Sequence, residues 1–191
     1  HQVYYVSSED QFYVCEDGVN QPLNRGIILA GDLRVDEQAE VDALAGVSWI
    51  VGNLTVHGDL DLSPLGGISR ISGSFVIEEN PSLTDLGVLE NLIDIEGSLS
   101  VNSNPALTNI DALAGLTELS GNLQFNDNDA LTNVDALSDL ATVSGTLTFA
   151  ANASLTNLDG LSGLTSISGG LTLIDNDALT NLDGLSGVTS L

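Results

Sequence analysis

The chain has very little positive charge and few of the residues that cross-link proteins or bind soft metals. Its 191 residues include three Lys or Arg in total, against 27 Asp and Glu, so the formal net charge is −24. Such a surface repels phosphates and anionic lipids, which argues against nucleic acid and membrane surfaces as partners. The single cysteine, Cys15, excludes an internal disulfide framework and a thiolate metal site.

Long apolar runs are missing as well. No run approaches the roughly 18 residues that a membrane-spanning helix needs, so we expect no direct membrane insertion. Yet 42% of the residues are hydrophobic, which is too many for a chain disordered by composition. A chain so rich in acidic residues suits exposure to salty water, where carboxylates are screened, although a compositional bias of the source lineage would also explain it. We therefore expect a folded, acidic protein that is extracellular or at a cell surface.

An internal repeat governs the rest of the sequence. A Gly followed shortly by an apolar-x-apolar triplet returns at intervals of 21 residues in the first part of the array and 24 residues from Gly97 onward. The alternation within each triplet predicts a short, half-buried strand, and the Gly is expected to permit the tight bend before it. The predicted strands are Leu33–Val35, Leu54–Val56, Phe75–Ile77, Leu99–Val101, Leu123–Phe125, Leu147–Phe149 and Leu171–Leu173.

Between the strands, apolar residues recur at intervals of three. Leu107, Ile110, Leu113, Leu116 and Leu119 illustrate this spacing, which predicts a tight, 3₁₀-like turn with one inward face. One coil buries too little apolar surface to offset the entropy of ordering its residues, so only a stack of coils folds. The sequence therefore predicts a β/α solenoid of 21- and 24-residue coils, with short parallel strands forming one sheet.

Two long stretches of the C-terminal coils carry a family likeness. They read LTNIDALAGLTELSGNLQFNDNDALTNVDALSDLATVSG and LTNLDGLSGLTSISGGLTLIDNDALTNLDGL. These resemble leucine-rich repeats of the receptor L-domain type, over roughly residues 27–191. The resemblance implies a right-handed leucine-rich-repeat superhelix with one parallel sheet, and a role in extracellular binding or cell-surface architecture rather than catalysis.

The two ends of the chain depart from the repeat. Residues 1–26 do not repeat and are predicted to form an N-terminal cap over the first coil, while residues 27–191 form a single array. At Leu191 the sequence stops where the next Ser-Gly pair should begin, so we expect the array to be truncated or open there. An unpaired strand edge is a template for association, which predicts self-association through the C-terminal coil or fraying of its last residues.

Two polar columns recur with the repeat. The Asn column is predicted to be an inward structural ladder whose amides satisfy backbone groups; its members are Asn80, Asn104, Asn128, Asn152 and Asn176. The Asp column would bring carboxylates about 4.8 Å apart, and their repulsion must be offset. Either each Asp caps the helical turn that follows it, or Ca²⁺ binds between them. This column consists of Asp111, Asp135, Asp159 and Asp183.

The outward sheet face is predicted to carry the ligand site near its N-terminal end. Arg34 and His57 could orient a glycan or a peptide there, with an ordinary solvated surface as the alternative. An exposed Trp49 could stack on a sugar or contact a protein, with packing against the N-terminal cap as its alternative. The candidate binding residues are Arg34, Asp36, Trp49, Thr55, His57 and Glu78.

Catalysis finds little support in the sequence. Only His1 and His57 could act as bases at neutral pH, and Cys15 has no evident His partner. We therefore expect a non-enzymatic binding or adhesion module that recognises a protein or glycan ligand. One alternative is a structural subunit or stalk segment of a surface layer or filament. Another is an ice-binding protein, suggested by a Thr column at positions 84, 108, 132, 156 and 180.

Overall fold

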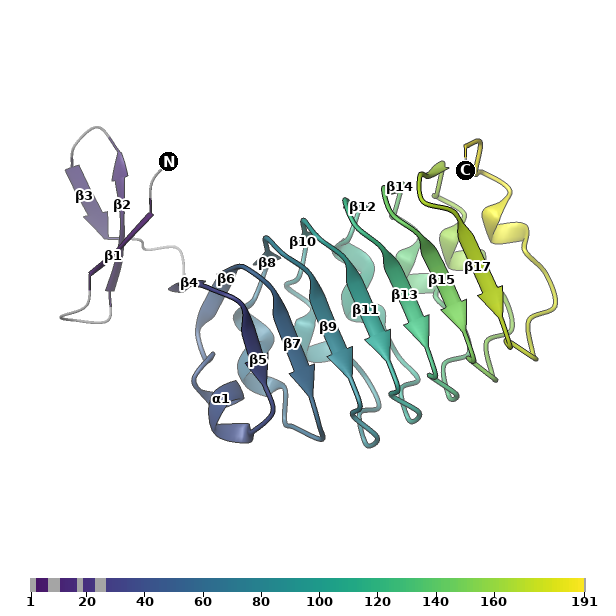
Figure 1. Cartoon of the computed structure of the whole chain (residues 1–191), viewed down its shortest axis with the longest axis horizontal. Helices are drawn as coiled ribbons and strands as arrows, with labels where there is room; N and C mark the ends of the chain where they lie inside the picture. The colour runs from purple at the N-terminus through teal and green to yellow at the C-terminus, as the bar shows by residue number, and fades with distance from the viewer. Residues whose placement is uncertain (1–2, 7–10, 17–18, 23–26, 191) are drawn as a thin grey trace.

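A row of parallel strands dominates the molecule. The computed structural model describes residues 3–6, 11–16, 19–22 and 27–190, with side chains described from residue 27 onward. Figure 1 shows seven strands side by side, in the order β17-β15-β13-β11-β9-β7-β5. They are β5 (Leu33–Val35), β7 (Leu54–His57), β9 (Phe75–Glu78), β11 (Leu99–Asn102), β13 (Leu123–Asn126), β15 (Leu147–Ala150) and β17 (Leu171–Ile174).

Each coil adds a turn, and a second row of strands, most of them only two residues long, lies outside the long sheet. The turns are α1 (Gln38–Asp42) and the 3₁₀ segments η1 (Ser63–Gly67), η2 (Gly87–Leu89), η3 (Asp111–Gly115), η4 (Asp135–Leu137), η5 (Asp159–Leu161) and η6 (Asp183–Leu185). The strands of this second row are β4 (Ile27–Ala30), β6 (Val47–Val51), β8 (Arg70–Ile71), β10 (Asp94–Ile95), β12 (Glu118–Leu119), β14 (Thr142–Val143) and β16 (Ser166–Ile167). They pair in parallel into a four-stranded and a three-stranded sheet.

These features confirm the predicted fold class, a leucine-rich-repeat-like solenoid of about 24 residues per unit. The single long sheet and the 3₁₀ turns were expected from the sequence. The second row of strands was not, because five of its seven strands have only two residues, too few to leave an alternating pattern.

Near the N-terminus the structure describes three further strands. Strands β1 (Val3–Val6), β2 (Gln11–Glu16) and β3 (Val19–Pro22) form an antiparallel sheet in that order. The side chains that would form a cap over the first coil lie outside the described residues, as do His1 and the side chain of Cys15. The cap over residues 1–26 therefore stays a prediction.

The core lies inside the stack of coils. Because the strands pair in register, like side chains of successive coils meet; Leu123, for example, lies between Leu99 and Leu147. The rings of Phe125 and Phe149 stack at 5.4 Å between centroids with 4° between their planes. All five side chains are fully buried. The repeat thus places each apolar position against its own counterpart.

The predicted Asn ladder is confirmed for four buried members, while the fifth, Asn176, is half-buried and accepts from Asn152. Asn80, Asn104, Asn128 and Asn152 are at most 1% exposed. Each of these four donates its backbone N–H and its side-chain Nδ2 to the Oδ1 of the Asn one coil further on, at 2.9–3.4 Å. The Nδ2 of Asn128 also donates to the Val101 carbonyl at 2.9 Å. The ladder therefore satisfies buried backbone groups at the corner after each strand.

Most of the glycines that precede the long strands are required by close packing between coils, not by the tight bend that the sequence suggests. Gly31 and Gly52 have positive φ, as a tight bend predicts, but the later members of the column do not. At Gly97, a Cβ would lie 2.6 Å from the carbonyl carbon and oxygen of Gly73. The later glycines are therefore required because the backbones of neighbouring coils approach closely at this column.

The last coil exposes apolar side chains that the coils before it bury. Leu171 is 36% exposed and Leu182 48%, whereas their counterparts Leu147 and Leu158 are fully buried. Ile174 on β17 is 52% exposed. In the part of the chain that the structure describes, no helix is long and apolar enough to cross a membrane.

Candidate functional site

Strands β5, β7 and β9 place a mixed-charge cluster on the outer face of the long sheet. Arg34 lies opposite Thr55, and His57 lies opposite Glu78 in the parallel register. Because side chains alternate between the two faces of a strand, these four residues point away from the core, while neighbours such as Val56 are buried. Five of the six predicted binding residues therefore share this face, with Asp36 the fifth.

Arg34 is held by two carboxylates. Its Nε lies 2.9 Å from Oδ1 of Asp36, and its Nη1 donates to Oε1 of Glu78 at 2.9 Å, across the intervening strand β7. The hydrogen bond to Glu78 raises the pKa of Arg34 above its ordinary value, and Asp36 adds to the effect. Arg34 is thus paired with carboxylates of its own chain, although its side chain is still 48% exposed.

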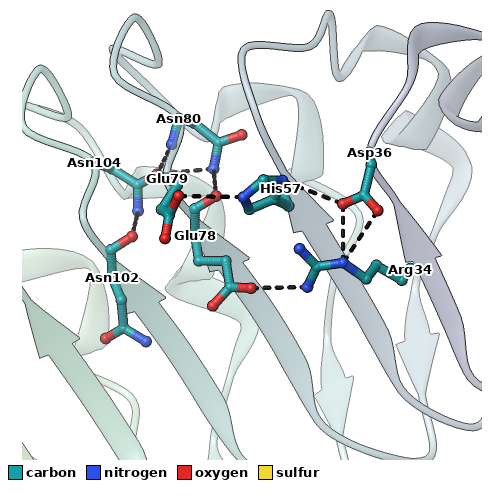
Figure 2. Close-up of polar contacts among 8 residues, drawn as sticks. All are labelled: Arg34, Asp36, His57, Glu78, Glu79, Asn80, Asn102 and Asn104. Carbon is teal, nitrogen blue, oxygen red and sulfur yellow. Dashed lines mark hydrogen bonds and ion pairs between the residues drawn. The ribbon is translucent and has the colours of Figure 1, made fainter.

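His57 lies between the carboxylates of Asp36 and Glu79. Its Nδ1 is 3.2 Å from Oδ1 of Asp36, and its Nε2 is 3.3 Å from Oε2 of Glu79, as Figure 2 shows. A neutral imidazole donates from one nitrogen only, whereas the imidazolium donates from both. The geometry therefore accommodates the protonated ring with both of its donors used.

Glu79 is a member of the cluster that sequence reasoning missed. The alternation along β9 places Glu78 outward, and alternation alone would point the next residue the other way. Its backbone is left-handed instead, with φ of 56°, as is that of Gly58 with φ of 90° at the same point of the coil before. This turn brings the Glu79 carboxylate back to His57. The glycine at the corresponding place was the one available signal.

The cluster carries a net negative charge. Three carboxylates, Asp36, Glu78 and Glu79, face one guanidinium, so the sum is −2 with His57 neutral and −1 with His57 protonated. Its cations are already paired, which leaves little attraction for an acidic ligand. The surface suits ligands that are neutral and rich in hydroxyl groups, or that carry positive charge.

Trp49 lies apart from this cluster. It belongs to β6, in the four-stranded sheet of the second row, where it pairs with Arg70 of β8. The Arg70 guanidinium carbon is 5.8 Å from the centre of a Trp49 ring, and the same guanidinium forms a 2.7 Å ion pair with Asp94. Because β6 belongs to a different sheet from β5 and β7, Trp49 does not share a sheet face with Arg34 and His57, contrary to the prediction from the sequence. Its predicted packing against the cap falls on residues outside the described part.

The Asp column does not cap the helical turns as expected. Its members are the first residues of η3 to η6 and are exposed; they are Asp111, Asp135, Asp159 and Asp183. Each donates its backbone N–H, at 2.7–3.1 Å, to the side-chain oxygen of the Asn two residues earlier. This contact is an Asx turn, in which the Asn side chain, rather than that of the Asp, accepts a hydrogen bond at the start of the 3₁₀ segment. The accepting residues are Asn109, Asn133, Asn157 and Asn181.

Within the described residues, no group of three or more His, Cys, Asp or Glu side chains could hold a metal ion. Binding of Ca²⁺ between exposed Asp111 and its counterparts accordingly stays a prediction.

Three of the five members of the Thr column are hydrogen-bonded to the backbone. The hydroxyls of Thr108, Thr156 and Thr180 each donate to the carbonyl of the Thr one coil earlier, at 3.1–3.2 Å. Their donors are therefore used within the protein, which weakens the ice-binding alternative.

Comparison with protein-family models finds no match to this chain. A comparison with curated proteins finds no match either. The leucine-rich-repeat-like assignment rests on the repeating unit, the long parallel sheet and the buried Asn ladder.

Proposed function

We propose that the protein is a non-enzymatic binding module of the receptor L-domain type, secreted or displayed at a cell surface, and that it recognises a protein or glycan through the sheet face at β5, β7 and β9. The observation that carries this proposal is the cluster of Arg34, Asp36, His57, Glu78 and Glu79. Its ion pairs link three strands and yet leave every member partly exposed.

The cluster suits recognition because its polar atoms are fixed before a ligand arrives. Side chains that already hold one geometry lose less conformational entropy on binding. Guanidinium and imidazole donors lie beside carboxylate acceptors on the sheet face, which suits the hydroxyl groups of a neutral glycan or the polar groups of a peptide. The net negative charge disfavours acidic polysaccharides.

The test is binding of the protein to arrays of neutral and acidic glycans and of secreted proteins. We expect saturable binding to a neutral or basic ligand. The double variant Arg34→Ala/His57→Ala should weaken it at least tenfold. A matched variant, Thr148→Ala/Thr172→Ala, lies on the same sheet at β15 and β17 and should change it less than twofold. A ligand that binds both variants as well as the wild type contradicts the proposal, as does the absence of any saturable binder.

We also propose, as a second candidate function, a structural subunit that self-associates through the C-terminal coil. The supporting observation is the exposed apolar end of the array, formed by Leu171, Ile174 and Leu182. Strand β17 pairs only with β15 among the described strands, so one of its backbone edges is free to pair with another chain.

Self-association should disappear when this end is made polar. We expect analytical ultracentrifugation to show association of the wild type that rises with concentration, and a monomer for Ile174→Lys. Ile93 offers the control, because it is 58% exposed on another part of the array. The variant Ile93→Lys should associate like the wild type. A monomeric wild type, or equal loss in both variants, contradicts the role of the C-terminal coil.

A further inference from the structure

A second candidate site lies away from the sheet face, where a 21-residue coil meets a 24-residue coil. Five residues connect β7, which ends at His57, to η1, which begins at Ser63. Eight residues connect β9, which ends at Glu78, to η2, which begins at Gly87. The unequal connections leave a hollow of about 400 Å³ between them.

The lining of the hollow is acidic with aliphatic patches. The carboxylates come from Asp59, Asp61 and Asp85, and the aliphatic side chains include Leu60, Leu83 and Val88. Within residues 27–190, the ion pairs of Arg34, His57 and Arg70 go to other carboxylates, so these three Asp side chains have no cationic partner there. An apolar wall beside an acidic one suits a side chain with an aliphatic stem and a charged head.

The three carboxylates are fixed in place by local hydrogen bonds. Asp59 accepts from the backbone N–H of Ser82 at 2.7 Å and from its hydroxyl at 2.9 Å. Asp61 accepts from the hydroxyl and backbone N–H of Ser63, and these bonds lower its pKa, so it stays ionised at neutral pH. Asp85 accepts from the backbone N–H of Gly87 at 2.9 Å. Each carboxylate keeps lone pairs for a further donor.

A buried acceptor beside the hollow lacks a donor. Asn80 lines the hollow, is 1% exposed, and its Oδ1 has no hydrogen-bond partner. In the rest of the ladder this oxygen accepts from the Asn of the coil before. The register places Asp59 at that position; its carboxylate has no N–H to offer, and its backbone N–H forms no bond to this oxygen. In Figure 2 the Oδ1 of Asn80 points away from Asn104, to which the Nδ2 of the same carboxamide donates. This atom needs a donor that the chain does not supply.

We propose that the hollow receives an arginine side chain of a partner protein. The planar guanidinium has five N–H donors, enough to serve several separate acceptors at once. Among the described residues, these three carboxylates do not form a group that could hold a metal ion. The aliphatic stem would pack on Leu60, Leu83 and Val88, while the head meets Asp59, Asp61, Asp85 and Asn80. None of the carboxylates of this site belongs to the sheet-face cluster, and the site would bind a basic residue of a partner protein.

The test is an NMR titration of the ¹⁵N-labelled protein with N-acetylarginine amide. We expect saturable shifts confined to the Asn80 side chain and to the backbone amides of Ser82 and Asp85. The double variant Asp61→Asn/Asp85→Asn should raise the Kd at least tenfold. It should fold, because Asn109 already fills the same turn position one coil later, accepting the Asp111 N–H at 2.7 Å.

The matched control removes the same charge elsewhere. Asp111→Asn/Asp135→Asn changes two exposed carboxylates outside the hollow, and the Kd should stay within twofold of the wild-type value. Equal weakening in both double variants would show general charge attraction and overturn the site. Equal affinity for N-acetyllysine amide would overturn the assignment to guanidinium, and CaCl₂ binding at the same amides without arginine binding would replace it with a cation site. The absence of saturable shifts would also overturn the proposal.

Discussion

Replacing Asn128 with leucine is expected to lower the free energy of unfolding by roughly 2–6 kcal/mol, because it leaves two or more buried polar groups without partners at about 1–3 kcal/mol each. Asn128 is fully buried. Its Nδ2 donates to the Val101 carbonyl at 2.9 Å, and its Oδ1 accepts from the backbone N–H of Asn104 at 3.3 Å. Leucine has a similar volume but can form neither bond. No water can replace the amide where the new side chain fills its space.

Urea unfolding followed by circular dichroism measures this loss. The control is Asn91→Leu, because Asn91 is exposed and its Nδ2 makes a single bond, at 2.8 Å, to the Gly66 carbonyl. That variant should lose no more than about 1 kcal/mol, the usual net value of one hydrogen bond. If Asn128→Leu and Asn91→Leu unfold at the same urea concentration, the ladder does not stabilise the fold in the way its contacts indicate.

The repeat made the fold predictable from the sequence. Leu99, Leu123 and Leu147 are separated by one period and bury side by side, so a pattern visible in one dimension becomes a column in three. The Asn ladder follows from the same reasoning. In a solenoid, each residue meets its own counterpart in the next coil, and sequence spacing translates directly into contact.

The sheet-face cluster was predictable only in part. Alternation along the strands placed Arg34, His57 and Glu78 on one face, because strand geometry repeats every two residues. It could not place Glu79, whose left-handed backbone interrupts that alternation. Trp49 was misplaced for a related reason, since β6 belongs to a second row of strands that the triplet pattern does not mark.

The acidic hollow could not have been predicted from the repeat at all. It depends on a difference between two neighbouring coils, and the periodic pattern describes only what the coils share. The missing donor for Asn80 arises in the same way, because Asp59 replaces the Asn that the ladder would otherwise have there.

Gly97→Ala is expected to destabilise the fold by about 3 kcal/mol or more, because the added methyl group meets backbone atoms that have no room to move. Its Cβ would lie 2.6 Å from the carbonyl carbon and oxygen of Gly73 and 2.7 Å from the nitrogen of Ser74. Separating the coils would stretch the 3.0 Å hydrogen bond from the Gly97 N–H to the Gly73 carbonyl. Gly73 is itself held against Gly52 in the same way, so the strain passes to the next coil.

Gly66→Ala provides the comparison, since both variants add one methyl group at a glycine. The nearest atom to a Cβ at Gly66 is the Val88 carbonyl oxygen at 3.2 Å, and φ there is not positive. Alanine reduces the entropy of the unfolded chain, so this variant should stay within about 1 kcal/mol of the wild type. The free energy of unfolding of both variants is measured by urea unfolding. If Gly97→Ala does not fold at all while Gly66→Ala does, the prediction is also met. Equal stability of the two variants would mean that the coils can separate at little cost in free energy. The close approach of the backbones would then not be the reason for glycine in this column.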